Sequence, residues 1–223
     1  MKNVKEMVLR RLENQVEEEN VVEEAKEQIG EGEFLQMVLQ EINNKTFNLV
    51  GAFDEEQLKR FKEFASNLYF YENDPNPTVN IRISSYGGNI DILFAILSEI
   101  ERLKEMWECS VTTSVAGWAS SCGALLWLCG NKREMSEFDE IMLHQISYGI
   151  NQNLTGHERE LKRSQKIQKK IDKLITTHSP LTQKQLNKFY KNGDTFLDYE
   201  DCLKLDLITI EEKDGENEGE ETK

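Results

Sequence analysis

Long apolar runs are missing from this 223-residue sequence, which has no apolar stretch of the roughly 18 residues that a membrane-spanning helix needs. The first residues also lack the basic-then-apolar order of a signal peptide. The four cysteines form no Cys-x-x-Cys pair and mostly lie in apolar runs, which is typical of reduced core residues and not of disulfides or zinc ligands. We therefore expect a cytoplasmic protein with neither a membrane segment nor a metal site.

Positive charge is also scarce, because 27 lysines and arginines face 41 aspartates and glutamates, for a net charge of -14. Such a surface repels phosphate groups, so nucleic acid and anionic membranes are poor partners for it. Much of the excess is local, with eleven acidic against six basic residues in 1–45 and seven against two in 211–223. We expect an acidic helical arm over residues 1–45 and a disordered acidic tail over residues 211–223.

Strand and helix patterns alternate between these two ends. In the first half, strands are predicted at Thr46–Val50, Val79–Ile83 and Ser110–Val115, and helices from Asp54 to about Asn67 and over residues 90–104. This alternation predicts an α/β domain over residues 46–210 in which consecutive strands are parallel and joined by right-handed crossovers.

The second half of the domain is predicted to contain shorter strands and a long charged helix. The predicted elements are strands near Arg133–Met135 and at Glu140–His144, helices over residues 156–177 and Gln183–Tyr190, a strand-and-helix segment at Phe196–Leu203, and a last strand at Leu207–Ile210.

Residues 117–130 combine a turn of small residues with an uncharged apolar run, Gly-Trp-Ala-Ser-Ser-Cys-Gly-Ala-Leu-Leu-Trp-Leu-Cys-Gly. The run from Cys122 to Cys129 predicts a buried helix. Ser120 and Ser121 then lie at its N-terminus, where free N–H groups and the helix dipole stabilise negative charge. A serine hydroxyl at this position is a candidate nucleophile, and the alternative is a serine that only caps the helix.

A serine nucleophile needs a base and a group that orients the base. Of the three histidines, His157 and His178 lie in the charged helical region and are expected to face solvent. His144 ends an apolar strand at the same sheet edge as Ser121, which favours it as the base over a structural role. Asp194 follows a helix-ending glycine and precedes an apolar segment, so it is a candidate orienting group, or only a turn aspartate.

Together these motifs resemble the proteolytic subunit of the Clp protease, the ClpP family. Four segments are similar to motifs of that family: Ser84–Gly88 to its Asn-Ser-Pro-Gly-Gly turn, Gly117–Gly123 to its Gly-x-Ala-Ala-Ser-Met-Gly turn, Met142–Gln145 to its Met-x-His-Gln strand, and Gly193–Leu197 to its Arg-Asp-x-Phe-Leu turn. The order agrees, with 23 residues from the serine to the histidine and 50 from there to the aspartate. The likeness covers about residues 46–210.

The resemblance implies a ClpP/crotonase-like spiral of ββα units with a protruding helical handle at about residues 149–180. It also implies a serine endopeptidase that needs no cofactor and cleaves peptides or unfolded proteins. Ser121 would attack the scissile carbonyl, His144 would carry the proton, and Asp194 would fix the imidazole tautomer. The backbone N–H groups of Gly88 and Cys122 would form the oxyanion hole.

Assembly is implied in the same way. The family predicts a homo-oligomer of heptameric rings, extending to a tetradecamer when two rings join through their handles. Family tyrosines that line the pocket for the ATPase partner are replaced by Asn80 and Arg82, so a standard Clp ATPase is not an expected partner. Tyr86, Trp118 and Ile146 also depart from the family pattern. We expect a divergent member, of a phage or mobile-element type.

Two alternatives share the predicted fold. A crotonase-type acyl-CoA enzyme uses the same spiral and a backbone oxyanion hole, so fold alone does not separate it from a peptidase. Such an enzyme does not require Ser121, His144 and Asp194 in this arrangement. A catalytically idle scaffold would keep the assembly and lose the chemistry, and it differs from a peptidase in the alignment of these three side chains.

Overall fold

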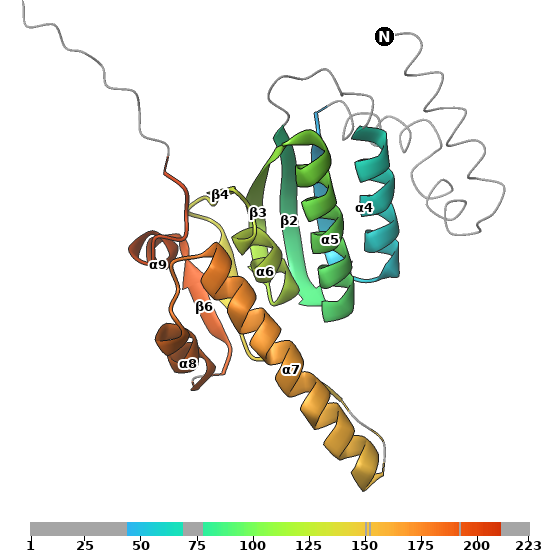
Figure 1. The fold of residues 1–223 in the computed structure, drawn as a ribbon. Helices are drawn as coiled ribbons and strands as arrows, with labels where there is room; N and C mark the ends of the chain where they lie inside the picture. The colour runs from blue at the N-terminus through green and yellow to red at the C-terminus, as the bar shows by residue number, and fades with distance from the viewer. Residues whose placement is uncertain (1–43, 69–77, 150, 152, 192, 211–223) are drawn as a thin grey trace, which may run out of the picture.

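A computed structural model describes residues 44–68, 78–149, 151, 153–191 and 193–210 (Figure 1). The predicted tail over 211–223 and nearly all of the predicted arm over 1–45 lie outside these residues, so both stay predictions. Among the described helices, none combines the length and the apolar character that crossing a membrane requires.

The described strands form one six-stranded sheet with the order β1-β2-β3-β5-β6, and β4 pairs with β3 beside this path. The strands are β1 (Thr46–Phe53), β2 (Thr78–Gly88), β3 (Ser110–Ser120), β4 (Lys132–Glu134), β5 (Glu140–Leu143) and β6 (Thr195–Asp198). All pairings are parallel except that of β6 with β5. The predicted α/β class and its parallel order of strands are confirmed.

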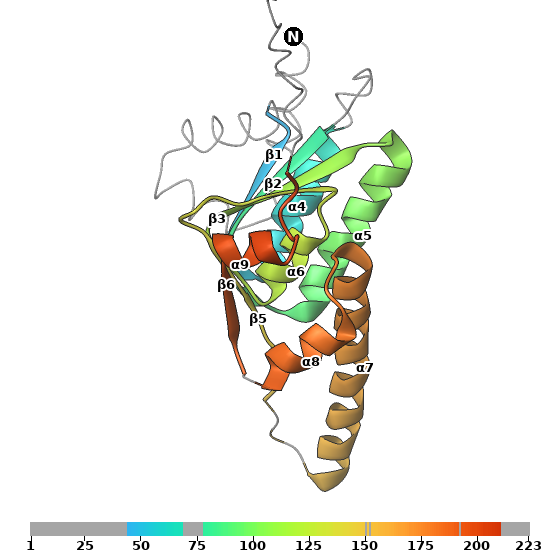
Figure 2. The same ribbon diagram turned by 90° about the vertical axis from the view of Figure 1, so that its left-hand side faces the viewer.

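Helices lie against this sheet and beside its C-terminal strands. They are α4 (Glu55–Asn67), α5 (Ile90–Trp107), α6 (Cys122–Leu128), α7 (Leu154–His178), α8 (Gln183–Lys191) and α9 (Tyr199–Lys204). Helix α4 packs on α5 and β1, α5 packs on α6, and α6 packs on β2 and β3, so the three helices cover one face of the sheet (Figure 1). The N-terminal end of α7 projects away from the sheet in both views (Figures 1 and 2), at the place of the predicted handle.

Side-chain caps start three of the described helices, of which the cap at Asp54 was predicted, and α7 begins two residues before its predicted start. Asp54 accepts a hydrogen bond from the backbone N–H of Gln57 at 2.9 Å and begins α4. Asn89 caps α5 in the same way, and Asn153 caps α7. The apolar sides of these helices then close one hydrophobic core over the sheet.

Three strands continue past their predicted ends at glycine-containing turns, and β2 runs on from Ile83 through the predicted Ser84–Gly88 turn to Gly88. β1 extends to Phe53 and β3 extends to Ser120, beyond the predicted limits at Val50 and Val115. Gly51 adopts φ 93° and the β1–β2 register shifts there, and the β2–β3 register also shifts before Ala119. Both glycine turns are therefore absorbed as bulges, which bend a strand without ending it.

The predicted last strand at Leu207–Ile210 is wrong, since this segment is irregular. Asp206 adopts φ 57°, and the N–H of the next residue returns to the carbonyl of Cys202 at 2.9 Å, which turns the chain away from a strand path. The apolar pattern reflects burial in the core instead. Only Thr209 reaches the sheet edge, where its N–H donates to the carbonyl of Arg133 at 2.9 Å.

Candidate active site

Ser121 lies in the sharp turn between β3 and α6, as predicted. Its φ of 54° and ψ of -118° are unusual for a residue with a side chain, and such strain is concentrated at functional sites. Its N–H donates to the carbonyl of Met142 at 2.8 Å, and its carbonyl accepts from Leu125 at 3.1 Å, which hold the turn. The Ser121 side chain makes no capping hydrogen bond to α6, so the capping alternative is wrong for this serine.

Two glycines make room for this turn. Gly87 adopts φ 102°, and a Cβ atom there would lie 2.6 Å from the Cβ and 3.1 Å from the Oγ of Ser121. Gly88 adopts φ 150°, and a Cβ atom there would lie 2.5 Å from the backbone nitrogen of Phe53. Any side chain at Gly87 would displace the serine hydroxyl, which explains the Gly-Gly pair in physical terms.

His144 follows β5 and faces Ser121. The parallel pairing of β3 with β5 sets Ser120 beside Met142, two residues before the histidine. The Nε2 atom of His144 lies 2.7 Å from the Oγ of Ser121, which is hydrogen-bond distance. The pair has the geometry of a serine and the base that takes its proton.

Asp194 reaches the other side of the His144 ring through the antiparallel pairing of β5 with β6. Leu143 pairs with Thr195, so the next pair along the two strands is His144 and Asp194. The Nδ1 atom of His144 lies 3.8 Å from the Oδ1 of Asp194, and the Asp194 side chain is 59% exposed. This distance is that of an ion pair and is too long for a hydrogen bond.

Gly88 and Cys122 line the same pocket as Ser121 and His144. The Sγ of Cys122 donates to the carbonyl of Gly88 at 3.4 Å, which ties the end of β2 to the start of α6. Burial raises the pKa of the Cys122 thiol to about 11, so the thiol stays neutral near pH 7. The cysteine next to the serine is therefore a packing residue and not a second nucleophile.

The pocket has a volume of about 320 Å³, with an apolar floor and a charged rim. The floor residues are Leu125, Leu143, Ile146 and Ile171, and the rim residues are Asp91, Glu160 and Arg163. Arg163 on α7 donates to the Oδ2 of Asp91 on α5 at 2.7 Å, and to Glu160 at 3.3 Å. Our sequence interpretation missed the rim; the helical spacing of Glu160, Arg163 and Ile171 was the signal that could have placed them on one side of α7.

The remaining histidines lie away from this pocket. His157 is exposed, as predicted, but His178 is half-buried at the end of α7, so the prediction that it faces solvent is wrong. Its carbonyl accepts a hydrogen bond from Arg133 at 3.3 Å. Burial lowers the pKa of His178, which makes it a neutral packing residue at the C-terminus of the helix.

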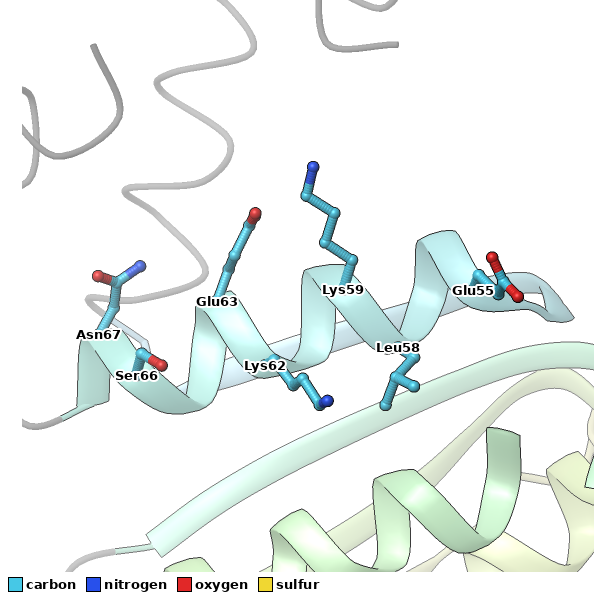
Figure 3. A pocket seen from close by; sticks show the side chains of 7 residues that line it. All are labelled: Glu55, Leu58, Lys59, Lys62, Glu63, Ser66 and Asn67. Atoms are coloured by element: carbon cyan, nitrogen blue, oxygen red, sulfur yellow. The ribbon is translucent and has the colours of Figure 1, made fainter. Parts of the chain in front are cut away.

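Two other hollows in the described part of the chain lack a comparable convergence of reactive groups. Figure 3 shows one of about 390 Å³ along α4, lined by lysines, acids and small polar residues: Glu55, Leu58, Lys59, Lys62, Glu63, Ser66 and Asn67. A groove of about 670 Å³ between α5 and α7 is lined mainly by lysines and arginines of α7. Within the described ranges, no cluster of His, Cys, Asp and Glu side chains has the arrangement of a metal site.

The sequence was also compared with models of known protein families. The family described as Clp protease matches residues 33–210, which is more than half of the chain. The matched region contains all five predicted site residues, Gly88, Ser121, Cys122, His144 and Asp194. It begins inside the segment predicted to be the acidic arm.

Proposed function

The chain belongs to the Clp protease family, and within that family we propose that it is a serine endopeptidase that uses Ser121, His144 and Asp194. The observation that carries this proposal is the 2.7 Å contact between the Oγ of Ser121 and the Nε2 of His144. A backbone turn with a positive φ presents the serine hydroxyl to the pocket beside this histidine. Membership of the family supports a ClpP-type peptidase, and the contact supports these residues as its reactive pair.

In the proposed reaction the Oγ of Ser121 attacks the carbonyl carbon of the scissile peptide bond while His144 takes the hydroxyl proton. His144 then gives this proton to the leaving amine, and an acyl-enzyme ester remains. Water, deprotonated by His144, hydrolyses the ester and restores the serine. Asp194 faces the Nδ1 of His144, where it would hold the imidazole tautomer and stabilise the imidazolium.

The oxyanion that forms during attack needs two hydrogen-bond donors, for which we propose the N–H groups of Gly88 and Cys122. Cys122 is the first residue of α6, and N–H groups in a first helical turn have no partner within the helix. The N–H of Asn89 donates to Phe53 on β1 at 2.9 Å. Because successive N–H groups of a strand point to opposite edges, this favours an orientation of the Gly88 N–H toward the serine.

Substrates are proposed to be peptides or unfolded proteins. A folded domain would not fit a pocket of about 320 Å³ that is walled by α5, α6 and α7. The apolar floor favours an apolar side chain next to the cleaved bond. The proposed reaction uses protein groups alone and takes place in the cytoplasm.

Assembly of several copies is supported by the sheet face opposite α4, α5 and α6. The register directs Val50, Tyr86, Trp118 and Phe196 to this face, where their exposed fractions are 60%, 73%, 38% and 55%. Tyr86 and Trp118 stack with ring centroids 4.8 Å apart. Exposed apolar groups gathered on one face are typical of an interaction surface. We propose homo-oligomeric rings, heptameric as in the family, with α7 as the handle between two rings.

We also propose that the chain does not bind a standard Clp ATPase. Asn80 is half-buried and Arg82 is exposed on β2, where the family has docking tyrosines. Polar side chains at both positions would weaken an apolar docking pocket. Co-purification of a stable complex with such an ATPase would contradict this part.

An idle scaffold is the second candidate, and the 3.8 Å separation of His144 and Asp194 is the observation that favours it. The acyl-CoA alternative has no use for the short contact between serine and histidine, so that contact weighs against it.

Labelling with a fluorophosphonate probe, which reacts with activated serines, tests the proposal directly. We expect labelling of the wild type and of Ser120→Ala, and none of Ser121→Ala. Ser120 is the matched control because it is the neighbouring serine at the end of β3. Absence of labelling in the assembled wild type would favour the scaffold.

A further inference from the structure

The ladder between β5 and β6 ends one residue short of His144 and Asp194. The last pair is Leu143 with Thr195, so His144 and Asp194 lie just beyond the ladder. Strand ends without ladder hydrogen bonds fray unless other contacts hold them. The position of both groups therefore depends on what anchors the chain after His144 and before Asp194.

A side chain of α7 and a backbone carbonyl of α8 provide the two anchors. After His144, the N–H of Ile146 donates to the Oε1 of Gln168 on α7 at 2.8 Å. Before Asp194, the N–H of Gly193 donates to the carbonyl of Tyr190 on α8 at 3.4 Å.

These two anchors are joined through one carboxylate of α7. The Nε2 of Gln168 donates to the Oδ1 of Asp172 at 2.7 Å, and the hydroxyl of Tyr190 donates to the same oxygen at 2.8 Å. The Nε2 of Gln168 also lies 3.2 Å from the Tyr190 hydroxyl. Helices α7 and α8 pack against each other at this point (Figure 2).

We propose that Gln168, Asp172 and Tyr190 form a clamp that positions His144 and Asp194 relative to each other. The inference rests on the proposed function, since it concerns the geometry of the same reaction. None of the three side chains lines the pocket, and Gln168 contacts the lining only through the backbone N–H of Ile146, so they are positioning residues and not catalytic ones.

The chemistry of the clamp admits one arrangement of donors and acceptors. Ile146 offers a backbone N–H, so the Gln168 amide must present its oxygen there and its NH2 group to Asp172. Burial and the bond to Asp172 raise the pKa of the Tyr190 phenol, which keeps the phenol protonated as a donor. Gln183 donates to the second oxygen of Asp172 at 3.0 Å. A half-buried network satisfied in this way resists displacement of any single member.

Tyr190→Phe is the sharpest test, because it removes one hydroxyl and keeps the ring. Peptide hydrolysis by the full-length assembled protein is expected to show a kcat that is about threefold to tenfold lower, with KM changed less than about twofold. Asp172→Ala removes the shared acceptor and is expected to lower kcat further. Tyr199→Phe, which alters a half-buried tyrosine outside the clamp, is the matched control and should leave both constants unchanged.

A double mutant separates positioning from general packing. If the clamp acts through Asp194, Tyr190→Phe should lower the probe-labelling rate in the wild type and have no further effect in Asp194→Ala. The same fold loss in both backgrounds, or no loss in either, would overturn the clamp. A wild type that neither labels nor cleaves peptides would instead overturn the proposed function, which the clamp requires.

Discussion

The two sides of the His144 ring differ in how they are held. On the Nε2 side, Ser121 lies 2.7 Å away in a turn fixed by parallel strands, a buried helix and a close glycine. On the Nδ1 side, Asp194 lies 3.8 Å away and is 59% exposed, beyond the end of a short antiparallel ladder. Ser121 lies in a turn that the sheet and α6 hold, whereas Asp194 lies just past a short ladder and would depend on α7 and α8 through the proposed clamp.

This difference predicts unequal losses when each side is removed. His144→Ala should lower kcat by about 10³-fold or more, since both proton transfers stop. Asp194→Asn should cost less, about 10-fold to 100-fold, because the carboxylate is exposed and does not touch the ring. Steady-state peptide hydrolysis measures both. Equal losses would mean that Asp194 is held as firmly as Ser121 during the reaction.

Two glycine variants compare the sides by backbone strain. Gly87→Ala places a methyl group 2.6 Å from the Cβ of Ser121 at φ 102°, so we expect about 100-fold lower activity and about 2 kcal/mol lower stability. Gly193, beside Asp194, adopts φ 82°, and a Cβ atom there would meet open space. Gly193→Ala should therefore lower stability by a similar amount through backbone strain, and lower activity by less than about fivefold. Urea unfolding measures the loss of stability and peptide hydrolysis the loss of activity. A larger loss of activity in Gly193→Ala than in Gly87→Ala would contradict the prediction.

Arg163 lies farther from the ring, and its removal tests the rim of the pocket. Arg163→Ala breaks the contacts with Asp91 and Glu160 and leaves two carboxylates at the rim. We expect substrates with a basic residue near the cleaved bond to gain about twofold to fivefold in kcat/KM, and acidic ones to lose as much. A matched peptide series with Lys, Gln and Glu at one position measures this. Arg159→Ala, in the groove between α5 and α7, is the control.

The smallest expected effect concerns Cys122, the neighbour of Ser121. Burial raises the pKa of its thiol from 9.0 to about 11, so the unfolded chain loses this proton at lower pH than the folded chain. The free energy of unfolding should therefore fall between pH 9.0 and about 11, by an amount on the order of 1 kcal/mol. Urea titrations over this range should give a shallower decline for Cys122→Ala. A decline as steep as in the wild type would assign the effect to other groups.

The sequence was a good guide to the parts of the fold that local pattern encodes. Apolar periodicity and the cap predicted at Asp54 placed the first three strands and α4, α5 and α6, with ends that differ by up to five residues. It failed where tertiary contacts decide, as at Leu207–Ile210, where Leu207 and Ile208 are buried without joining the sheet and Ile210 is exposed. Glycine turns in β1 and β3 were read as strand ends because a bulge needs a partner strand to exist.

The candidate site divides in the same way. Ser121 stood out because it precedes an uncharged apolar run, and His144 because it ends an apolar strand pattern; the two side chains lie 2.7 Å apart. Asp194 was selected through the resemblance, because its place depends on the register between β5 and β6. Gln168, Asp172 and Tyr190 gave no signal, since polar residues on exposed helices are ordinary until their contacts are known.

The stacked pair of Tyr86 and Trp118 has an optical consequence. Trp127 is fully buried, whereas Trp118 is 38% exposed on the sheet face proposed for assembly. In separated protomers an aqueous quencher such as acrylamide would reach the indole of Trp118 and not that of Trp127. Joining protomers through this face would shield Trp118 and shift its emission to shorter wavelength. Trp118 would thus report the proposed association on dilution without any label, as a change over the emission of Trp127 and of the half-buried Trp107.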